Sequence, residues 1–187
     1  MIELVTERLA LRPFRVEDRP LLAGLMRDPA VFFWETQPVS DAAVDAVLER
    51  TRALEPRAMG WFAAFRRDDD GTFVGTVALK PADPARSADA EISWHLRPAC
   101  WGNGFATEGA RAVLDHAMRV VRPERVVAYA LPDNIRSLRV IRRVGLPYIG
   151  ERQHAGLPHA FFALSRTADR PAAPASSPNS GHPGPHA

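Results

Sequence analysis

The stretch 90–121 constrains the fold of this chain more than any other. Apolar and polar residues alternate over 90–96, and this period of two predicts a half-buried strand. Apolar residues recur at helical spacing over 106–121, which predicts a helix of about four turns. The connection between them carries Gly102 and Gly104. A strand therefore runs through a glycine-bearing turn directly into a helix.

This connection predicts an anion site. A strand–turn–helix arrangement gathers unpaired backbone N–H groups and the positive end of the helix dipole at one place. Because Gly102 and Gly104 have no Cβ, a phosphate can approach the backbone closely. A pyrophosphate is the ligand we expect, and a simple tight turn is the alternative. The dinucleotide-binding fingerprint fails at Thr107, where it needs Gly or Ala, and no Gly-Lys-Ser/Thr follows, which excludes a P-loop.

Three ordered motifs resemble one protein family. The stretch Glu91-Ile-Ser-Trp-His-Leu-Arg-Pro, followed by Trp101-Gly-Asn-Gly-Phe-Ala-Thr-Glu108, resembles the acetyl-CoA-binding motif of the GNAT N-acetyltransferase superfamily. Residues 6–14, with Glu17-Asp18, resemble the N-terminal signature of its RimJ/RimL-type branch. Residues 133–146 resemble the second cofactor motif of that branch. The resemblance covers residues 3–166.

The order of the predicted elements indicates a mixed α/β fold. A strand, two helices, a hairpin, a central strand, a helix, a strand, a helix and final strands favour a mostly antiparallel sheet with helices on both faces. The resemblance implies a GNAT-like sheet in which 90–96 and 125–131 lie side by side and splay apart, with acetyl-CoA in the gap. The other predicted strands cover 9–13, 61–65, 73–79, 148–149 and 159–164, and the other helices cover 17–27, 41–54 and 134–145.

Composition predicts one domain and a tail. The 187 residues suit a single acetyltransferase-like domain over 1–168. Over 169–187, Pro, Ser, Gly and Ala prevail, which predicts a disordered tail. A single cysteine rules out an internal disulfide and suits a reducing cytosol, and no signal segment or spanning apolar run is visible, so we expect a cytoplasmic protein without a membrane partner. The net charge of +2 without a Lys/Arg run gives no support to DNA binding. Monomer and homodimer both stay open.

The resemblance implies two sets of cofactor contacts. The pyrophosphate would lie on the backbone amides of 101–106, and the pantetheine arm would pair with the edge of the central strand. Ala99 stands where the family usually has Gln or Arg, and Arg97 is close enough to compensate. Asn134 matches the residue that hydrogen-bonds the cofactor arm. The candidate cofactor-binding residues are Leu96, Arg97, Trp101, Gly102, Asn103, Gly104, Phe105, Ala106 and Asn134.

Acetyl transfer to an amine requires a destination for the amine proton and stabilisation of the leaving thiolate. Glu91 resembles the base of histone-acetylating GNAT members; the alternative is a strand residue that is hydrated or paired with an arginine. His95, with Ser93 on the same face, has a suitable unperturbed pKa but is equally well explained as a spacer. Ser137 matches a serine thought to assist the leaving thiolate in RimL-type enzymes. Plain helix capping is the alternative for Ser137 and Asn134.

Other candidates are weaker. The helix over 134–145 carries no tyrosine, so Tyr129 and Tyr148 are outside candidates for a catalytic acid. Cys100 suggests an acetyl-cysteine, but the sequence places no histidine to activate it, so we expect direct attack in a ternary complex. No paired His/Cys spacing predicts a metal site. Trp34 and Glu35 belong to an aromatic segment that predicts a hydrophobic plug, and in the resembling family this segment borders the acceptor cleft.

These features predict an acetyl-CoA-dependent N-acetyltransferase that acts on a primary amine, either a protein N-terminus, as in RimJ/RimL-type enzymes, or a small molecule. A modest base such as Glu91 suits an α-amine, whose pKa is about 8 against about 10.4 for lysine. Two other hypotheses stay open. The chain could be a non-catalytic acetyl-CoA- or CoA-binding module for sensing or interaction, or a nucleotide-binding module that uses the glycine loop alone.

Overall fold

The computed structural model describes residues 2–33, 37–68, 71–83, 88–154 and 156–166. The strands in these ranges form one sheet in the order β1-β2-β3-β4-β5-β6-β8-β7. The strands are β1 (Leu4–Val5), β2 (Leu9–Pro13), β3 (Gly60–Arg66), β4 (Phe73–Pro81), β5 (Ala90–Leu96), β6 (Arg125–Ala130), β7 (Tyr148–His154) and β8 (Leu157–Ser165). The helices are α1 (Arg19–Met26), α2 (Asp41–Leu54), α3 (Phe105–His116) and α4 (Ile135–Val144).

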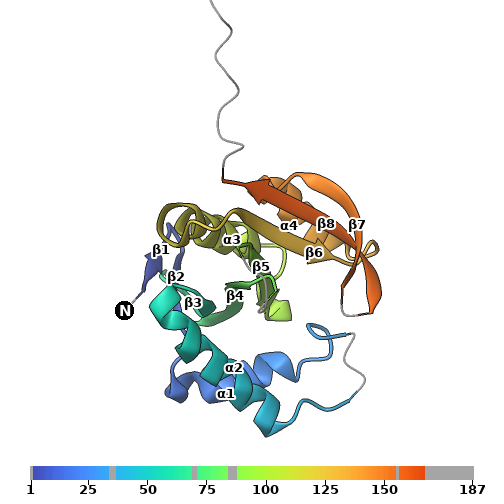
Figure 1. Cartoon of the computed structure of the whole chain (residues 1–187). Helices are drawn as coiled ribbons and strands as arrows, with labels where there is room; N and C mark the ends of the chain where they lie inside the picture. The colour runs from blue at the N-terminus through green and yellow to red at the C-terminus, as the bar shows by residue number, and fades with distance from the viewer. Residues whose placement is uncertain (1, 34–36, 69–70, 84–87, 155, 167–187) are drawn as a thin grey trace, which may run out of the picture.

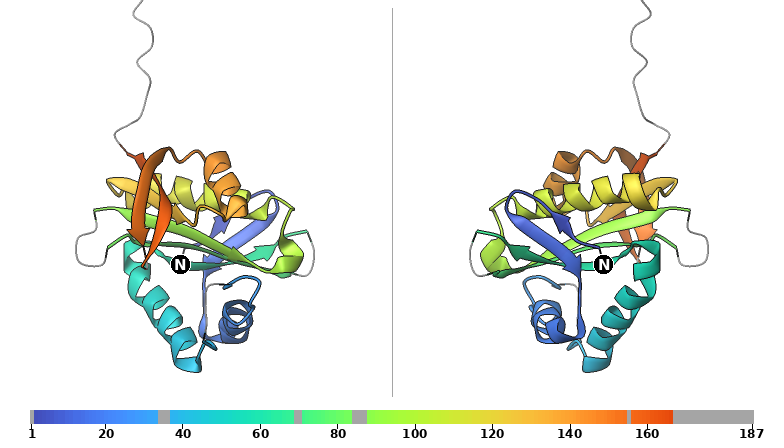
Figure 2. Two further views of the ribbon diagram at one scale, coloured as in Figure 1. Left: turned by 90° about the vertical axis from the view of Figure 1, so that its right-hand side faces the viewer. Right: turned by 90° about the vertical axis from the view of Figure 1, so that its left-hand side faces the viewer.

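The sheet lies between two layers of helices (Figure 1, Figure 2), with α1 and α2 on one side and α3 and α4 on the other. The larger core packs sheet residues such as Phe62 and Ile92 against α3 and α4. A smaller core packs Leu22 and Val44, from α1 and α2, against the opposite face. The predicted architecture, a mostly antiparallel sheet with helices on both faces, is confirmed.

Small residues let α3 lie close to the sheet. A Cβ added at Gly109 would lie 3.1 Å from Val77 Cγ2 and 3.4 Å from Leu11 Cδ2, so a larger side chain would lift the helix. The α-helix ends at His116 and continues as a π-helical turn over Ala117–Val121, which the sequence did not distinguish from α-helix. This close packing fixes the position of the α3 N-terminus over the sheet.

The strands β5 and β6 are parallel and separate almost at once. They pair at Ala90 with Val126 and at Glu91 with Val127. Beyond these two pairs, β5 continues along β4 to Leu96, whereas β6 continues along β8 to Ala130. The two strands therefore diverge toward their C-terminal ends, as predicted. This opening is the main feature of the fold that bears on function.

The sequence located α2, β5 and α4 closely, and the differences elsewhere have local causes. The first helix begins with a 3-10 turn over Val16–Asp18 before α1. The two-residue strand β1 is too short to show a periodicity. The strand β7 is longer than predicted. Most of its residues are exposed at the sheet edge, so the sequence shows no alternation of apolar and polar residues that would reveal its full length. Trp34, Glu35 and the predicted tail over 169–187 lie outside the described residues.

Candidate active site

The loop after β5 presents unpaired backbone N–H groups. Gly102 and Gly104 have φ angles of +80° and +82°, which glycine adopts without steric cost. The N–H groups of residues 102–107 donate to no residue that the structure describes, and the first bond into α3 runs from Glu108 N to the carbonyl of Gly104. The α3 dipole adds its positive end at the same place. These groups can hold an anion such as a pyrophosphate.

The side chains of the loop hold its shape from within. Trp101 Nε1 donates to the carbonyl of Leu96 at 2.7 Å, and Asn103 Nδ2 donates to the carbonyl of Trp101 at 3.0 Å. Cys100 is a buried free thiol in the 3-10 turn over Pro98–Cys100, as expected for a small turn residue. The backbone, and not these side chains, therefore faces a bound anion.

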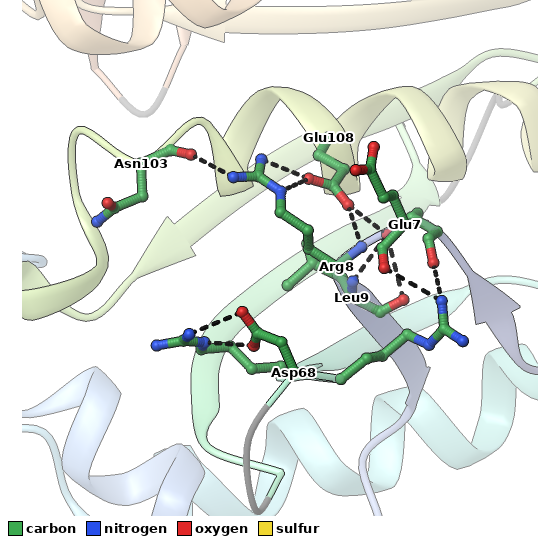
Figure 3. Close-up of polar contacts among 9 residues, drawn as sticks. Glu7, Arg8, Leu9, Asp68, Asn103 and Glu108 are labelled. Carbon is green, nitrogen blue, oxygen red and sulfur yellow. Dashed lines mark hydrogen bonds and ion pairs between the residues drawn. The ribbon is translucent and has the colours of Figure 1, made fainter.

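The connection between β1 and β2 anchors the loop and α3 (Figure 3). Arg8 Nε donates to Glu108 Oε2 at 2.7 Å, and Arg8 Nη1 donates to the carbonyl of Asn103 at 3.0 Å. Thr6 Oγ1 donates to Glu108 Oε1 at 2.6 Å. Burial alone would raise the pKa of Glu108, but the hydroxyl of Thr6 and the N–H groups of Arg8 outweigh it and lower the pKa. Thr6 and Arg8 of the N-terminal signature thus position the glycine loop.

The compensating phosphate contact that the sequence suggested for Arg97 stays a prediction. Nη1 of Arg97 donates to the carbonyl of Phe73 at 3.3 Å, which directs the guanidinium toward β4. The next residue, Pro98, begins a 3-10 turn. Ala99 cannot make the phosphate contact that the family usually makes from this position. A cation elsewhere in the chain would have to replace that contact.

The first turn of α4 follows β6 on the other side of the opening. Asn134 is the N-cap, and its Oδ1 accepts from Ser137 N at 3.1 Å. The capping explanation therefore holds for Asn134, although its amide N–H groups are still available to a ligand. Within the described ranges, the Ser137 hydroxyl has no hydrogen-bond partner. The roles of Asn134 toward the cofactor and of Ser137 toward the leaving group stay predictions.

Glu91 lies at the last pair between β5 and β6, and it forms an ion pair. Its Oε1 lies 2.9 Å from Nζ of Lys80, which faces it across the β4–β5 ladder. Glu91 is only 6% exposed. The partner is thus the single lysine of the chain and not an arginine. A proton transferred to Glu91 has to compete with this ion pair.

His95 lies farther along the same face of β5. Its ring stacks on Phe32 with centroids 4.6 Å apart. Burial, and then the charge of Lys80, lowers the pKa of His95 to about 4. His95 is therefore a weak base near neutral pH, although the unperturbed pKa of histidine would suit a proton acceptor.

A tyrosine–histidine stack that the sequence did not reveal lies on the C-terminal half of the sheet. The rings of Tyr129 and His154 are 4.3 Å apart at 14°. Burial and the charge of Glu91 raise the pKa of Tyr129. Burial lowers the pKa of His154, although Glu91 opposes this shift. Tyr129 therefore keeps its proton and His154 is neutral near pH 7.

This stack escaped notice because Tyr129 and His154 are distant in the sequence, and only the β6–β8–β7 order brings them together. Tyr148, the other outside candidate, is 58% exposed and packs edge-on against Phe162. Within the ranges described, no group of three or more His, Cys, Asp or Glu is arranged to hold a metal ion. No described helix is long and apolar enough to cross a membrane.

Comparison with known proteins identifies the class. The acetyltransferase (GNAT) domain family matches residues 8–147. The uncharacterized N-acetyltransferase YnaD of Bacillus subtilis is 34% identical over 146 residues, covering 78% of this chain and 82% of that protein. Ribosomal-protein-S5-alanine acetyltransferase from Vibrio fischeri has a TM-score of 0.75 at 15% identity, covering 91% of this chain and 100% of that one.

RimJ from Mycobacterium smegmatis, solved in complex with CoA-disulfide, has a TM-score of 0.69 at 20% identity, covering 86% of this chain and 83% of that one. The family model and the similarity to YnaD thus define an acetyltransferase. The chain belongs to the GNAT family of N-acetyltransferases. GNAT domains use acetyl-CoA and act on amine acceptors.

Proposed function

We propose that this chain transfers the acetyl group of acetyl-CoA to a primary amine by direct attack in a ternary complex. One observation carries the proposal: β5 and β6 separate after two pairs, and a loop of unpaired N–H groups follows β5 at the open end. An extended arm can pair with the free edge of β5, while the loop holds its phosphates. The residues present fit this ligand, because no side chain stands on Gly102 or Gly104.

The candidate cofactor contacts follow from this arrangement. Backbone N–H groups of 102–106 would hold the diphosphate, whereas the N–H of Trp101 donates to the carbonyl of Pro98 at 3.1 Å. Leu96, at the end of β5, would contact the arm. On the opposite side, Asn134 would donate its amide N–H groups to the arm. Because most of these contacts use backbone atoms, they depend on loop shape more than on side-chain identity.

The acetyl transfer needs two tasks from the protein. The amine nitrogen forms a bond to the acetyl carbon, the carbon–sulfur bond breaks, and the amine loses a proton while the thiolate gains one. We assign the proton acceptor to Glu91, directly or through water, and stabilisation of the thiolate to Ser137. Lys80 orients the Glu91 carboxylate but competes for it. Glu91 therefore suits amines that lose a proton readily.

This argument favours an α-amine over a lysine side chain, since the α-amine has the lower pKa. A protein N-terminus, as for the ribosomal L7/L12 alpha-N-protein acetyltransferase RimL that shares the fold, or a small-molecule amine would meet the requirement. We retain a cytoplasmic location as part of the proposal, because a reducing compartment suits the free thiol of Cys100.

A turnover assay with acetyl-CoA tests the proposal. The panel should contain N-terminal peptides, peptides with lysine as their only free amine, and small primary amines. We expect N-terminal or similarly acidic amines to be acetylated fastest. Tight binding of CoA without turnover of any amine would instead support a CoA-sensing module. Displacement of CoA by NAD or ATP would support a nucleotide-binding module.

A further inference from the structure

Several arginines near the glycine loop are held by protein groups. Arg8 is bound to Glu108 and to the carbonyl of Asn103. Arg66, near the ring of Phe105, forms two bonds of 2.8 Å with Asp68. Arg97 donates to the carbonyl of Phe73. The guanidinium groups of these three arginines therefore already donate hydrogen bonds within the protein.

Arg136 is different. It lies in the first turn of α4, and its guanidinium carbon is 4.5 Å from the centre of the Trp101 ring. No described carboxylate lies within ion-pair distance of it. Among the described residues, the interaction given for its guanidinium is thus the weak attraction of an aromatic face.

The contact connects the two sides of the opening. Trp101 belongs to the loop after β5 and is fixed by its bond to the carbonyl of Leu96. Arg136 belongs to α4, which follows β6. Because β5 and β6 diverge beyond Glu91, the Arg136–Trp101 contact spans the mouth between their C-terminal ends. The unpaired N–H groups of 102–107 begin at the residue after Trp101.

A cation at this place is suited to a phosphate. A guanidinium has five N–H donors, and contact with a ring face orients the group without supplying an oxygen or nitrogen acceptor for them. The N–H donors therefore stay available for phosphate oxygens, which arginine can bind in a bidentate manner.

We propose that Arg136 is a further ligand of the CoA diphosphate, held in position by Trp101, and that it supplies from α4 the cationic contact that Ala99 cannot make. This inference rests on the proposed function, namely that the chain binds acetyl-CoA. It assigns a positioning role to Trp101 and a direct binding role to Arg136.

Binding of three ligands to Arg136→Ala tests the inference. We expect the dissociation constants of CoA and 3′-dephospho-CoA, which both carry the diphosphate, to rise about tenfold by calorimetry. The constant of pantetheine, measured by competition, should stay unchanged. Arg139→Ala, an exposed arginine on the same helix, is the matched control and should leave all three constants unaltered. Arg136→Lys should recover part of the loss, because lysine keeps the charge but not the fork geometry.

Three results would overturn the inference. Unchanged affinity for CoA would remove Arg136 from the site. An equal loss for pantetheine would mean that Arg136 supports α4 or the arm. A loss for CoA without a loss for 3′-dephospho-CoA would place it at the 3′-phosphate. Failure of the proposed function is distinguishable, since the unmodified protein would then bind no CoA.

Discussion

In the proposed function, the cofactor side of the opening consists of β5, the glycine loop and α3, and the acceptor side consists of the side chains around Glu91. The two sides are built in different ways. The cofactor side is one continuous stretch, in which β5, the glycine loop and α3 follow each other in the sequence. Its contacts come mainly from backbone N–H groups. The acceptor side collects Lys80, Glu91, Tyr129 and His154 from four strands, and its properties depend on side chains and their pKa values.

The difference in construction between the two sides indicates which substitutions each side can tolerate. A continuous site is preserved as long as its local backbone conformation is kept, whereas a site assembled across strands changes with every register shift or side-chain substitution. Substrate choice should therefore be encoded on the acceptor side, and cofactor choice on the loop. Substitutions that affect only one side test this division.

The largest expected effect is on the acceptor side. Glu91→Gln should lower kcat about 10²-fold or more, the usual scale for a positioned general base, while the affinity for acetyl-CoA survives. The loss should shrink at high pH, where the amine arrives neutral. Profiles of kcat/KM against pH with one amine measure this effect.

Ser137→Ala is the companion variant, because its loss should persist across the same pH range if the hydroxyl stabilises the thiolate. Parallel profiles for the two variants would contradict the separate roles. Full activity of Glu91→Gln would remove Glu91 as the base, and His154 would become the first candidate because it is neutral near pH 7.

On the cofactor side, Gly104→Val should raise the dissociation constant of acetyl-CoA tenfold or more, about 1.4 kcal/mol. Valine is strained at a φ of +82° and its side chain would block the approach of phosphate. Gly145→Val introduces comparable strain at a φ of +96° in open space and serves as the control. Calorimetry that shows equal affinities in the two folded variants would refute the loop assignment.

A smaller effect should come from the anchor behind the loop. Glu108→Gln removes the charge that binds Arg8, which should cost about 1 kcal/mol and lower Tm by about 2–4 °C. Because the pKa of Glu108 is lowered in the fold, its contribution is present above the unfolded pKa and is lost as the pH falls through the folded pKa. The Tm values of Glu108→Gln and of the unmodified protein should therefore converge in acid. Glu151→Gln, an exposed residue of β7, should show no loss at any pH.

Near neutral pH the smallest effect concerns His95, because its influence on stability develops only in acid. Its pKa is about 4 in the fold and about 6.5 when unfolded, so between these values the unfolded chain binds more protons. Stability should therefore decrease as the pH falls from 6.5 to 4, and His95→Gln should weaken this dependence. Ser93→Ala, on the same strand face, should leave it unchanged. Equal slopes for His95→Gln and the unmodified protein would show that the pKa of His95 is not lowered in the fold.

The sequence predicted the parts of the molecule that depend on local chemistry. Alternation located β5, and the N-cap Ser40 located α2, with its Oγ accepting from Ala43 N at 3.2 Å. Likewise, Gly145 at a φ of +96° ends α4. The two loop glycines adopt a conformation that glycine permits, so the sequence predicted the loop shape on which the proposed anion site depends.

What the sequence could not provide was the register between strands. The Lys80–Glu91 pair and the Tyr129–His154 stack each depend on which residues face each other across a ladder. The pKa of His95 depends on burial against Phe32, a residue from beyond α1. The sequence also did not predict that the guanidinium of Arg97, one residue after β5, donates to the carbonyl of Phe73.

The separation of β5 from β6 divides the amide hydrogens of β5 into two groups with different solvent protection. Those that face β4 are held in a continuous antiparallel ladder. Beyond Glu91, those that face β6 meet no strand, so the sheet has a free edge in its interior. Outer edges of this kind attract other chains unless something covers them. Bound acetyl-CoA would then cover this interior edge of β5 in addition to reacting. When CoA leaves after each turnover, the edge would again be exposed to water.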